Sequence, residues 1–235
     1  MSMGREMKEA LLKTIPVAAG YLVMGFGFGV LLTARGYPFF WAPVMGLIVY
    51  AGSMQFVLID LLSGGAGIIT AAVMTFLINA RHLFYGLSML DEYRRVRRGR
   101  NYLIFSLTDE TFSIVASGLP KPDLDPGRYY LGVSALDQSY WVAGCLLGGL
   151  AGETLPFDFR GIEFSMTALF LVTFMEQWKT ARDKLPALIG LGSALLSLIV
   201  LGKDQMILPA MGLILACLLM ARRRDIGWME GRAHE

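Results

Sequence analysis

Residues 39–80 read FFWAPVMGLIVYAGSMQFVLIDLLSGGAGIITAAVMTFLINA and contain one charged side chain, Asp60. The stretches on either side of that aspartate, 39–59 and 61–80, are each close to the roughly 20 residues that a helix needs to cross a bilayer. Both are apolar on every helical face, whereas a surface helix of a soluble protein keeps a polar face. This region therefore predicts membrane helices rather than the core of a soluble domain.

The same apolar pattern extends over the rest of the chain. Hydrophobic residues make up 55% of the 235 residues and charged residues only 17%, too few to cover an ordinary soluble domain. Further apolar or weakly polar stretches lie at 15–32, 102–118, 129–151, 164–175, 185–202 and 206–221. We expect an all-α, polytopic helical membrane protein with seven or eight hydrophobic segments, some of them broken or re-entrant, in a single transmembrane domain over residues 1–235.

Basic residues cluster between these segments, and the cytoplasmic loops of membrane proteins are enriched in Lys and Arg. Five arginines fall in 91–101, which we expect to be a basic cytoplasmic loop. Residues 1–13 and 222–235 are expected to form a cytoplasmic N-terminal segment and a cytoplasmic tail. The net charge is only +2 and the basic residues are clustered, so membrane orientation explains them better than nucleic-acid binding.

These clusters conflict with a chain in which every segment crosses the membrane once. Three crossings from a cytoplasmic N-terminus would place 91–101 outside, so one segment fails to cross or a basic cluster is external. Segment 102–118 is short and polar, and we expect it to be a re-entrant or broken helix. In the first half, the glycine runs 25–29 and 64–67 are natural places for a break, and an external N-terminus is the competing solution.

Broken helices point to transport, because non-helical backbone in a bilayer is tolerated only where protein covers it or where it lines a cavity. The stretch 50–56, Tyr-Ala-Gly-Ser-Met-Gln-Phe, combines small residues with an amide in an apolar segment. Gly52 and Ser53 permit close helix approach, and Gln55 supplies both a donor and an acceptor. This stretch is either part of a binding site or a packing seam in which Gln55 bonds between helices.

The stretch 79–86, Asn-Ala-Arg-His-Leu-Phe-Tyr-Gly, places several polar groups within two helical turns. On a helix, Asn79 and His82 share one face, and Arg81 and Tyr85 share another. Arg81 either holds a substrate carboxylate or pairs with a buried acid. An imidazole has an unperturbed pKa of about 6.5, so His82 is either a proton carrier or a structural residue.

Two further groups of polar residues lie in the second half of the chain. Asp109 and Glu110 point in different directions on a helix, so one pairs with Arg81 while the other titrates, or both simply begin a helix. Beyond them, 137–152 contains glycines at helical packing intervals, which favours close helix packing. Asp137 and Gln138 are a candidate functional pair there.

Enzyme signatures are missing from the sequence. There is no His-Glu-x-x-His, no Gly-x-Ser-x-Gly, no phosphate loop and no dinucleotide-binding fingerprint. Both cysteines, Cys145 and Cys217, lie inside apolar segments, which predicts neither a disulfide framework nor a metal site. We therefore expect a protein that is not an enzyme and that needs no metal or other cofactor.

The stretches 50–56 and 79–86 closely resemble the two signature stretches of the AzlC family, which is the large subunit of branched-chain amino acid exporters. The resemblance continues through 108–112, 140–148 and 161–170. It implies a multi-pass protein of a bacterial or archaeal cytoplasmic (inner) membrane. The protein would export leucine, isoleucine, valine or similar apolar amino acids such as methionine, together with a small AzlD-type membrane subunit.

The polar residues fit a transporter driven by a proton gradient in antiport, because no Walker motif is present for ATP hydrolysis. A zwitterionic amino acid needs a group for its carboxylate and another for its ammonium. The expected substrate-binding or ion-binding residues are Ser53, Gln55, Asn79, Arg81, His82, Tyr85, Asp109 and Glu110. The alternative is a non-transporting assembly subunit, or a passive channel for small solutes, in which these residues only hold helices together. The resemblance assigns no role to Asp137.

Overall fold

The computed structural model describes residues 3–154 and part of 171–220, namely 171, 174–175, 178–179, 184–202, 206, 209–210, 212–218 and 220. Every regular element in these residues is an α-helix, which confirms the predicted all-α class for this part of the chain. The chain divides into two compact units, Met1–Thr167 and Ala168–Glu235.

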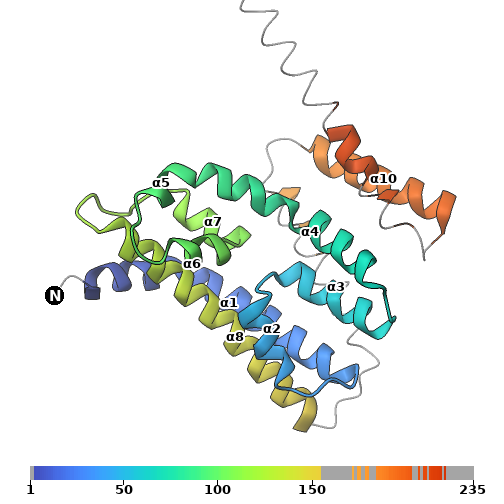
Figure 1. Ribbon diagram of the computed structural model, residues 1–235, viewed down its shortest axis with the longest axis horizontal. Coiled ribbons are helices and arrows are strands. Elements are labelled where there is room, and N and C mark those ends of the chain that lie inside the picture. Colours follow the sequence, from blue (N-terminus) through green and yellow to red (C-terminus); the bar gives the residue numbers. More distant parts are fainter. Residues whose placement is uncertain are drawn as a thin grey trace, which may run out of the picture. The chain divides into compact units, whose positions relative to one another are not determined.

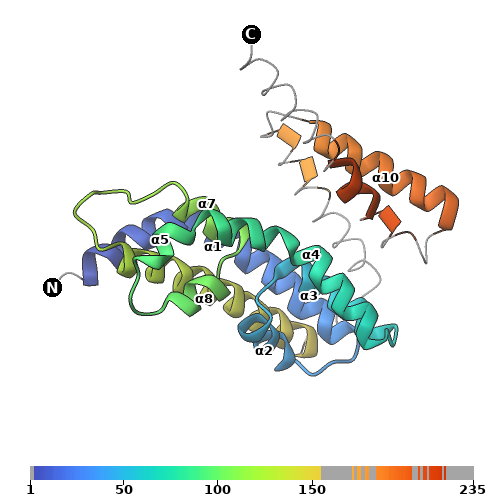
Figure 2. The same ribbon diagram turned by 45° about the horizontal axis from the view of Figure 1, so that its top comes forward.

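Two long helices, α1 (Met3–Ala34) and α8 (Pro126–Thr154), lie side by side through the first unit (Figures 1 and 2). They run parallel, because Gly132 of α8 lies beside Ala10 and Gly152 lies beside Thr33. Both helices therefore begin at one end of the unit and stop at the other. We call these the basic end, where the arginine-rich segment 91–101 also lies, and the far end.

Glycines bring α1 and α8 into close contact. A Cβ added to Gly148 would lie 2.0 Å from the carbonyl oxygen of Phe26, and one added to Gly29 would lie 2.4 Å from that of Cys145. Any larger residue would push the helices apart, since small residues four apart are what allow membrane helices to pack backbone to backbone. This glycine seam consists of Gly25 and Gly29 on α1 and Gly144, Gly148 and Gly152 on α8. The predicted packing role of the α8 glycines is confirmed.

The predicted break within 25–29 is wrong, because α1 continues through these residues without interruption. Gly25 and Gly29 face α8, so the missing side chains serve helix packing rather than backbone freedom. Gly27 lies between them and faces open space. The first-half break occurs instead in the next apolar segment.

Segment 39–59 forms two half-helices, α2 (Trp41–Ile48) and α3 (Gly52–Ser63), separated by a break at residues 49–51. Tyr50 has a φ of 40°, in the left-handed region that bulky residues rarely adopt. Such a conformation cannot continue a right-handed helix. The sequence segment that reads as one membrane span is thus a helical hairpin.

This first hairpin enters and leaves at the far end of the unit. The start of α2 lies beside Gly149, near the end of α8. At the break, Gly52 packs on the ring of Trp141, halfway along α8. Helix α3 then runs back until Asp60 lies 3.6 Å from Arg35, which directly follows α1. The hairpin therefore reaches about half of the depth of the α1–α8 pair and turns back.

Helix α4 (Ile68–Ser88) returns the chain to the basic end, after a turn in which Gly65 has a φ of 64°. The expected break at 64–67 is confirmed as this turn. Because the glycines end one helix and start the next, the span runs over 68–88 rather than over the predicted 61–80. The motif at 79–86 therefore lies inside a helix.

The basic end is held together by one hydrophobic cluster. Tyr93 and Val96, in and after the short α5 (Leu90–Arg94), pack with Ala10 of α1 and Tyr130 of α8. The start of α1 and residues 91–101 thus lie at the same end of the unit. The chain achieves this because segment 39–59 turns back instead of crossing.

A second hairpin approaches from the basic end. It consists of α6 (Arg100–Phe105) and α7 (Asp109–Val115), and both Leu103 and Val115 belong to the cluster at that end. Thr108 caps α7, because its Oγ1 accepts a hydrogen bond from the Thr111 amide at 3.3 Å. The predicted broken helix in 102–118 is confirmed. Two hairpins thus enter the first unit from opposite ends.

Two described helices are long and apolar enough to cross a membrane, judged by length and composition: Gly4–Ala34 and Ile68–Ser88. The predicted number of seven or eight segments is not confirmed, since most of 164–175 lies outside the described residues. In the second unit, α10 (Leu185–Leu201) coincides with the predicted segment 185–202. The tail 222–235 lies outside the described residues.

Candidate functional site

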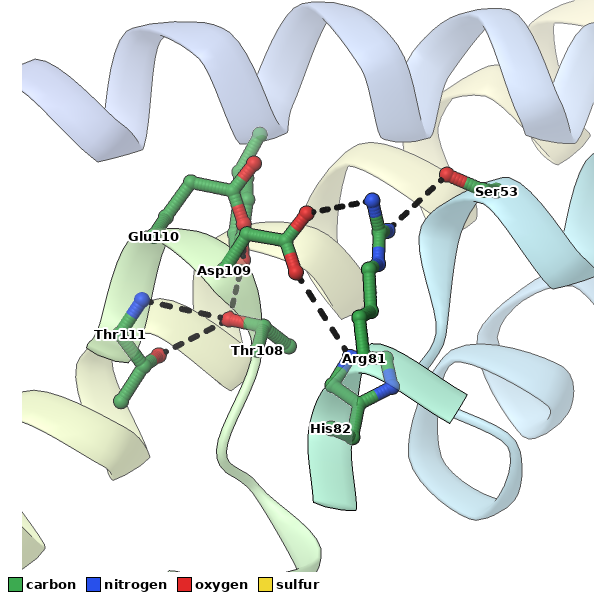
Figure 3. A network of polar contacts seen from close by, with 8 residues as sticks. Ser53, Arg81, His82, Thr108, Asp109, Glu110 and Thr111 are labelled. Atoms are coloured by element: carbon green, nitrogen blue, oxygen red, sulfur yellow. Dashed lines mark hydrogen bonds and ion pairs between the residues drawn. The ribbon is translucent and has the colours of Figure 1, made fainter. Parts of the chain in front are cut away.

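Arg81 of α4 connects the two hairpins (Figure 3). Its Nη1 lies 2.8 Å from Oδ2 of Asp109, in the first turn of α7, and its Nη2 donates to Oγ of Ser53 at 3.3 Å, in the first turn of α3. One guanidinium group therefore contacts the start of both inner half-helices. Arg81 was expected either to hold a substrate carboxylate or to pair with an acid of the protein. The structure contains the second arrangement.

The ion pair leaves one donor and one acceptor unfilled. Arg81 Nε and Asp109 Oδ1 are both inaccessible to solvent and have no hydrogen-bond partner. His82 Nε2 lies 3.8 Å from that carboxylate oxygen, too far for a hydrogen bond. The side chains of Arg81, Asp109 and His82 are 40%, 31% and 26% exposed, so the pair is half-buried.

Aromatic rings adjoin this ion pair. Tyr85, one turn after Arg81, stacks on Phe112 of α7 with ring centroids 4.6 Å apart, and it meets the edge of His82 at 5.8 Å. Tyr85 also lies close enough to interact with the Asp109 carboxylate. The His82 imidazole interacts with the backbone of Asn79, which is partly buried one turn earlier. These contacts fix the imidazole beside the carboxylate.

Gln55 lies away from the ion pair, in the interface between α3 and α8. It is fully buried, and its Oε1 accepts a hydrogen bond from Trp141 Nε1 at 2.9 Å. The structure thus favours the packing alternative for Gln55 over a position at the ion pair. Its Nε2 has no hydrogen-bond partner among the described residues.

Replacing Trp141 by phenylalanine should destabilise the protein by about 1–3 kcal/mol, because the buried Gln55 oxygen would lose its donor. The smaller ring would also leave space beside Gly52, which packs on the indole. Thermal unfolding in detergent measures the effect. Trp41→Phe is the matched control, since Trp41 is 47% exposed, and it should unfold like the parent. Equal unfolding of both variants would contradict the prediction.

Glu110 pairs with a residue that sequence reasoning missed. Its Oε2 accepts a hydrogen bond at 2.7 Å from the hydroxyl of Tyr21 on α1. The available signal was a single phenol in the apolar stretch 15–32. Of the two adjacent acids, Asp109 therefore contacts Arg81, while Glu110 faces α1. Both also begin a helix, so the pairing of Asp109 with Arg81 does not exclude the second alternative for these acids.

Known proteins are similar to this chain over the part that contains the Arg81 site. A family model described as "AzlC protein" matches residues 16–155, which include both hairpins and Arg81. Over 216 residues the chain is 40% identical to the branched-chain amino acid transport protein AzlC of Bacillus subtilis, covering 92% of this chain and 85% of the relative.

Other relatives are described as membrane proteins. The chain is 40% identical over 199 residues to an uncharacterized membrane protein of Haemophilus influenzae, covering 84% of this chain and 82% of that one. It is 27% identical over 170 residues to the inner membrane protein YgaZ of Escherichia coli, covering 69% of each. No solved structure matches.

Proposed function

Because this chain belongs to the AzlC family of membrane transport proteins, we propose that it exports branched-chain or similar apolar amino acids by proton-gradient-driven antiport. The substrates are leucine, isoleucine, valine and methionine, and a small AzlD-type membrane subunit completes the transporter. The name of the Bacillus subtilis relative supports the amino acid class. The geometry of the Arg81 site supports a zwitterionic substrate.

The observation that carries the proposal is the pair of unfilled atoms in the ion pair. Arg81 Nε is a donor without an acceptor, and Asp109 Oδ1 is an acceptor without a donor. An amino acid offers the complementary groups, a carboxylate and an ammonium, on one carbon atom. When it inserts, one ion pair is replaced by two, and no charge is left unpaired in a half-buried place.

The first turn of α3 adds to the carboxylate side of the site. A helix begins with amide groups that have no partner within the helix, and they carry a partial positive charge. Ala51 precedes α3 and has no side chain that could cap these amides. Ser53, already in contact with Arg81, adds a hydroxyl donor. The substrate carboxylate thus binds between Arg81 and the start of α3.

The stacked rings of Tyr85 and Phe112 supply the apolar side of the site. They lie on α4 and α7, the same helices that carry Arg81 and Asp109. An aliphatic side chain that covers these rings leaves water, which contributes about 25 cal/mol for each Å² of buried apolar surface. Polar amino acids lack this contribution, which accounts for selection of apolar substrates.

Proton coupling follows from competition for Asp109. A protonated His82 and the ammonium group of a substrate are both cations beside the same carboxylate oxygen, which lies 3.8 Å from His82 Nε2. Binding one disfavours binding the other, because a single half-buried carboxylate neutralises one positive charge. Proton and amino acid then cross in opposite directions on alternate halves of the cycle.

The proposed location is the bacterial or archaeal cytoplasmic membrane, with several passes. The basic end faces the cytoplasm, because the start of α1 and residues 91–101 lie there and Lys and Arg are enriched on that side. In this orientation, the α2–α3 hairpin enters from outside and the α6–α7 hairpin enters from the cytoplasm. The lipid bilayer covers the apolar residues exposed on α4.

The test is efflux of labelled leucine from vesicles that contain the chain and its small partner subunit. If one proton exchanges for one amino acid, a gradient of one pH unit supports a concentration ratio of about tenfold. Efflux that ignores the gradient would eliminate antiport, and absence of saturable efflux under every gradient would eliminate export. A vesicle preparation with a protonophore is the control.

A second candidate is a non-transporting assembly subunit or a passive channel. One observation favours it: Arg81 already bonds to Ser53 and Asp109, so these contacts serve to join three helices. A passive channel predicts unsaturable flux that does not respond to the proton gradient. An assembly subunit predicts no flux, with loss of the complex when the ion pair is removed.

A further inference from the structure

A line of hydrogen bonds runs from Glu110 through three hydroxyl groups to Asp137. The Tyr21 hydroxyl lies 2.7 Å from Glu110 Oε2 and 2.7 Å from Thr108 Oγ1. Thr108 Oγ1 lies 3.1 Å from Thr111 Oγ1, and Thr111 Oγ1 lies 2.8 Å from Asp137 Oδ2. Figure 3 shows the contact between Thr108 and Thr111, with Glu110 nearby. We call the five residues the hydroxyl relay.

The number of hydrogen atoms decides the charge of the relay. Its four contacts each need one hydrogen, and its three hydroxyl groups each carry one. If both carboxyl groups are ionised, one contact brings two oxygens together without a hydrogen between them. A single added proton, on either carboxyl group, supplies the missing hydrogen. All four hydrogen bonds then form at once.

The added proton can reside at either end. With the proton on Glu110, every hydroxyl donates toward Asp137; with the proton on Asp137, every hydroxyl donates toward Glu110. The Thr111 amide, which also donates to Thr108, is compatible with both arrangements because a hydroxyl oxygen accepts two hydrogen bonds. The heavy atoms need not move between the two arrangements.

Burial makes an incomplete relay costly. Asp137, Thr111, Thr108 and Tyr21 are all at least nine-tenths buried, and Asp137 Oδ1 has no hydrogen-bond partner. An ionised carboxylate in such surroundings is far more expensive than its neutral acid unless a cation pairs with it. No salt bridge to Asp137 is present in the described part of the chain.

The described groups that are seen to interact with the two carboxyl groups are acidic or phenolic, while the cations Arg81 and His82 lie at the neighbouring Asp109. Those that interact electrostatically with Asp137 are Glu110, Tyr50, Tyr102 and Tyr129. Those that interact with Glu110 are Tyr21, Tyr50, Tyr85 and Asp137. Each of these groups is neutral or negative, so none of them compensates a second negative charge on the relay. A shared proton does.

We propose that Glu110 and Asp137 share one proton, which moves between them through the hydroxyl groups of Tyr21, Thr108 and Thr111. In the forward step Glu110 passes its proton to Tyr21, and each hydroxyl in turn passes its own proton onward. Thr111 delivers the last one to Asp137 Oδ2. Every broken O–H bond is replaced by a new one, so the net change is one proton moved from Glu110 to Asp137.

The relay connects the neighbourhood of the Arg81–Asp109 ion pair to a proton-binding residue in the buried interior, Asp137. Glu110 is adjacent to Asp109 in the chain, whereas Asp137 is buried on α8. A proton that arrives near the Arg81 site can therefore be stored in the interior while an amino acid occupies Asp109. This use in the transport cycle rests on the proposed function, but the shared proton itself does not.

Infrared spectroscopy of the full chain in lipid tests the shared proton without any transported substrate. At neutral pH we expect the C=O stretch of one protonated carboxyl group that shifts in heavy water. Asp137→Asn should abolish it, because the amide NH₂ group supplies the missing hydrogen and leaves the partly exposed Glu110 ionised. Glu110→Gln should shift it, because the proton can then reside only on Asp137 and every hydroxyl donates toward the amide oxygen. An unshifted band in Glu110→Gln would overturn the proposal, since Glu110 would then have held no share of the proton.

Glu6→Gln is the matched control. Glu6 is also a buried carboxyl group on α1, with one oxygen that lacks a hydrogen-bond partner, but it lies outside the relay. The component lost in Asp137→Asn must persist unshifted in this control. Thr111→Val should shift the band and Thr111→Ser should preserve it, which tests the connection even if one carboxyl variant fails to fold. A parent protein without the band, or an unshifted band in Thr111→Val, would overturn the proposal.

Discussion

Replacing Arg81 by alanine is expected to reduce leucine efflux by at least about thirtyfold while the helices remain folded. The change removes the donors for the substrate carboxylate and leaves Asp109 without its cation at 2.8 Å. Truncating one partner of a desolvated ion pair costs about 2–5 kcal/mol, and the half-buried position of this pair favours the lower end of that range. Initial efflux rates at leucine concentrations below saturation, with folding followed by circular dichroism, measure both effects.

Arg94→Ala is the matched control for this substitution. Arg94 also lies near an acid, with Nη1 3.9 Å from Asp91 Oδ1, but its side chain is 65% exposed. Exposed pairs of this kind contribute about 0–1 kcal/mol, so efflux should be unchanged. Arg81→Lys should restore only part of the activity, because an ammonium lacks the guanidinium fork. If Arg81→Ala unfolds the protein, the assembly-subunit alternative gains support instead.

The second large effect is expected at the glycine seam. Gly148→Ala should destabilise the protein by about 3 kcal/mol or more, since a Cβ would lie 2.0 Å from the Phe26 carbonyl oxygen and the backbone of α1 cannot yield. Gly27→Ala should instead leave the protein as stable as the parent or slightly more stable. It places a methyl group in open space on the same helix pair, and alanine favours a helix over glycine by up to about 1 kcal/mol.

Thermal unfolding of the two variants in detergent distinguishes a steric clash at the seam from a general intolerance of substitution. The unfolding temperature of Gly148→Ala should lie below that of the parent, and the unfolding temperature of Gly27→Ala should equal or exceed it. Similar behaviour of the two variants would mean that α1 and α8 do not meet at the seam. The clash expected between the new Cβ at position 148 and the Phe26 carbonyl oxygen would then be absent.

Hydropathy predicted the helical class because apolar stretches long enough to cross a bilayer are rare in soluble domains, and glycines predicted the turn at 64–67. The break at 49–51 had a weaker signal, the single Gly52 that directly follows it. It lies in an apolar stretch and depends on tertiary packing, since Gly52 meets the Trp141 ring and Tyr50 adopts a positive φ. The error at 25–29 arose because glycine serves both breaks and close packing, and only the neighbouring helix distinguishes these uses.

The site was predictable in its residue types and less so in its pairings. Residues 79–86 and Asp109 stand out as polar and charged groups in apolar surroundings, so the Arg81–Asp109 contact could be anticipated as one alternative. Gln55 was harder to place, because an amide serves equally well in a binding site and in a helix interface. Tyr21 could not be selected from the sequence, since a lone phenol becomes a relay member only when α7 folds against α1.

Helix α4 carries Arg81 and His82 but is weakly anchored in the first unit. Met74 is its one fully buried side chain among the described residues, whereas Ile68 and Ile69 are more than four-fifths exposed. Because so little of its surface is buried in this unit, the contacts of Arg81 with Asp109 and Ser53 are an important part of what fixes its position relative to both hairpins.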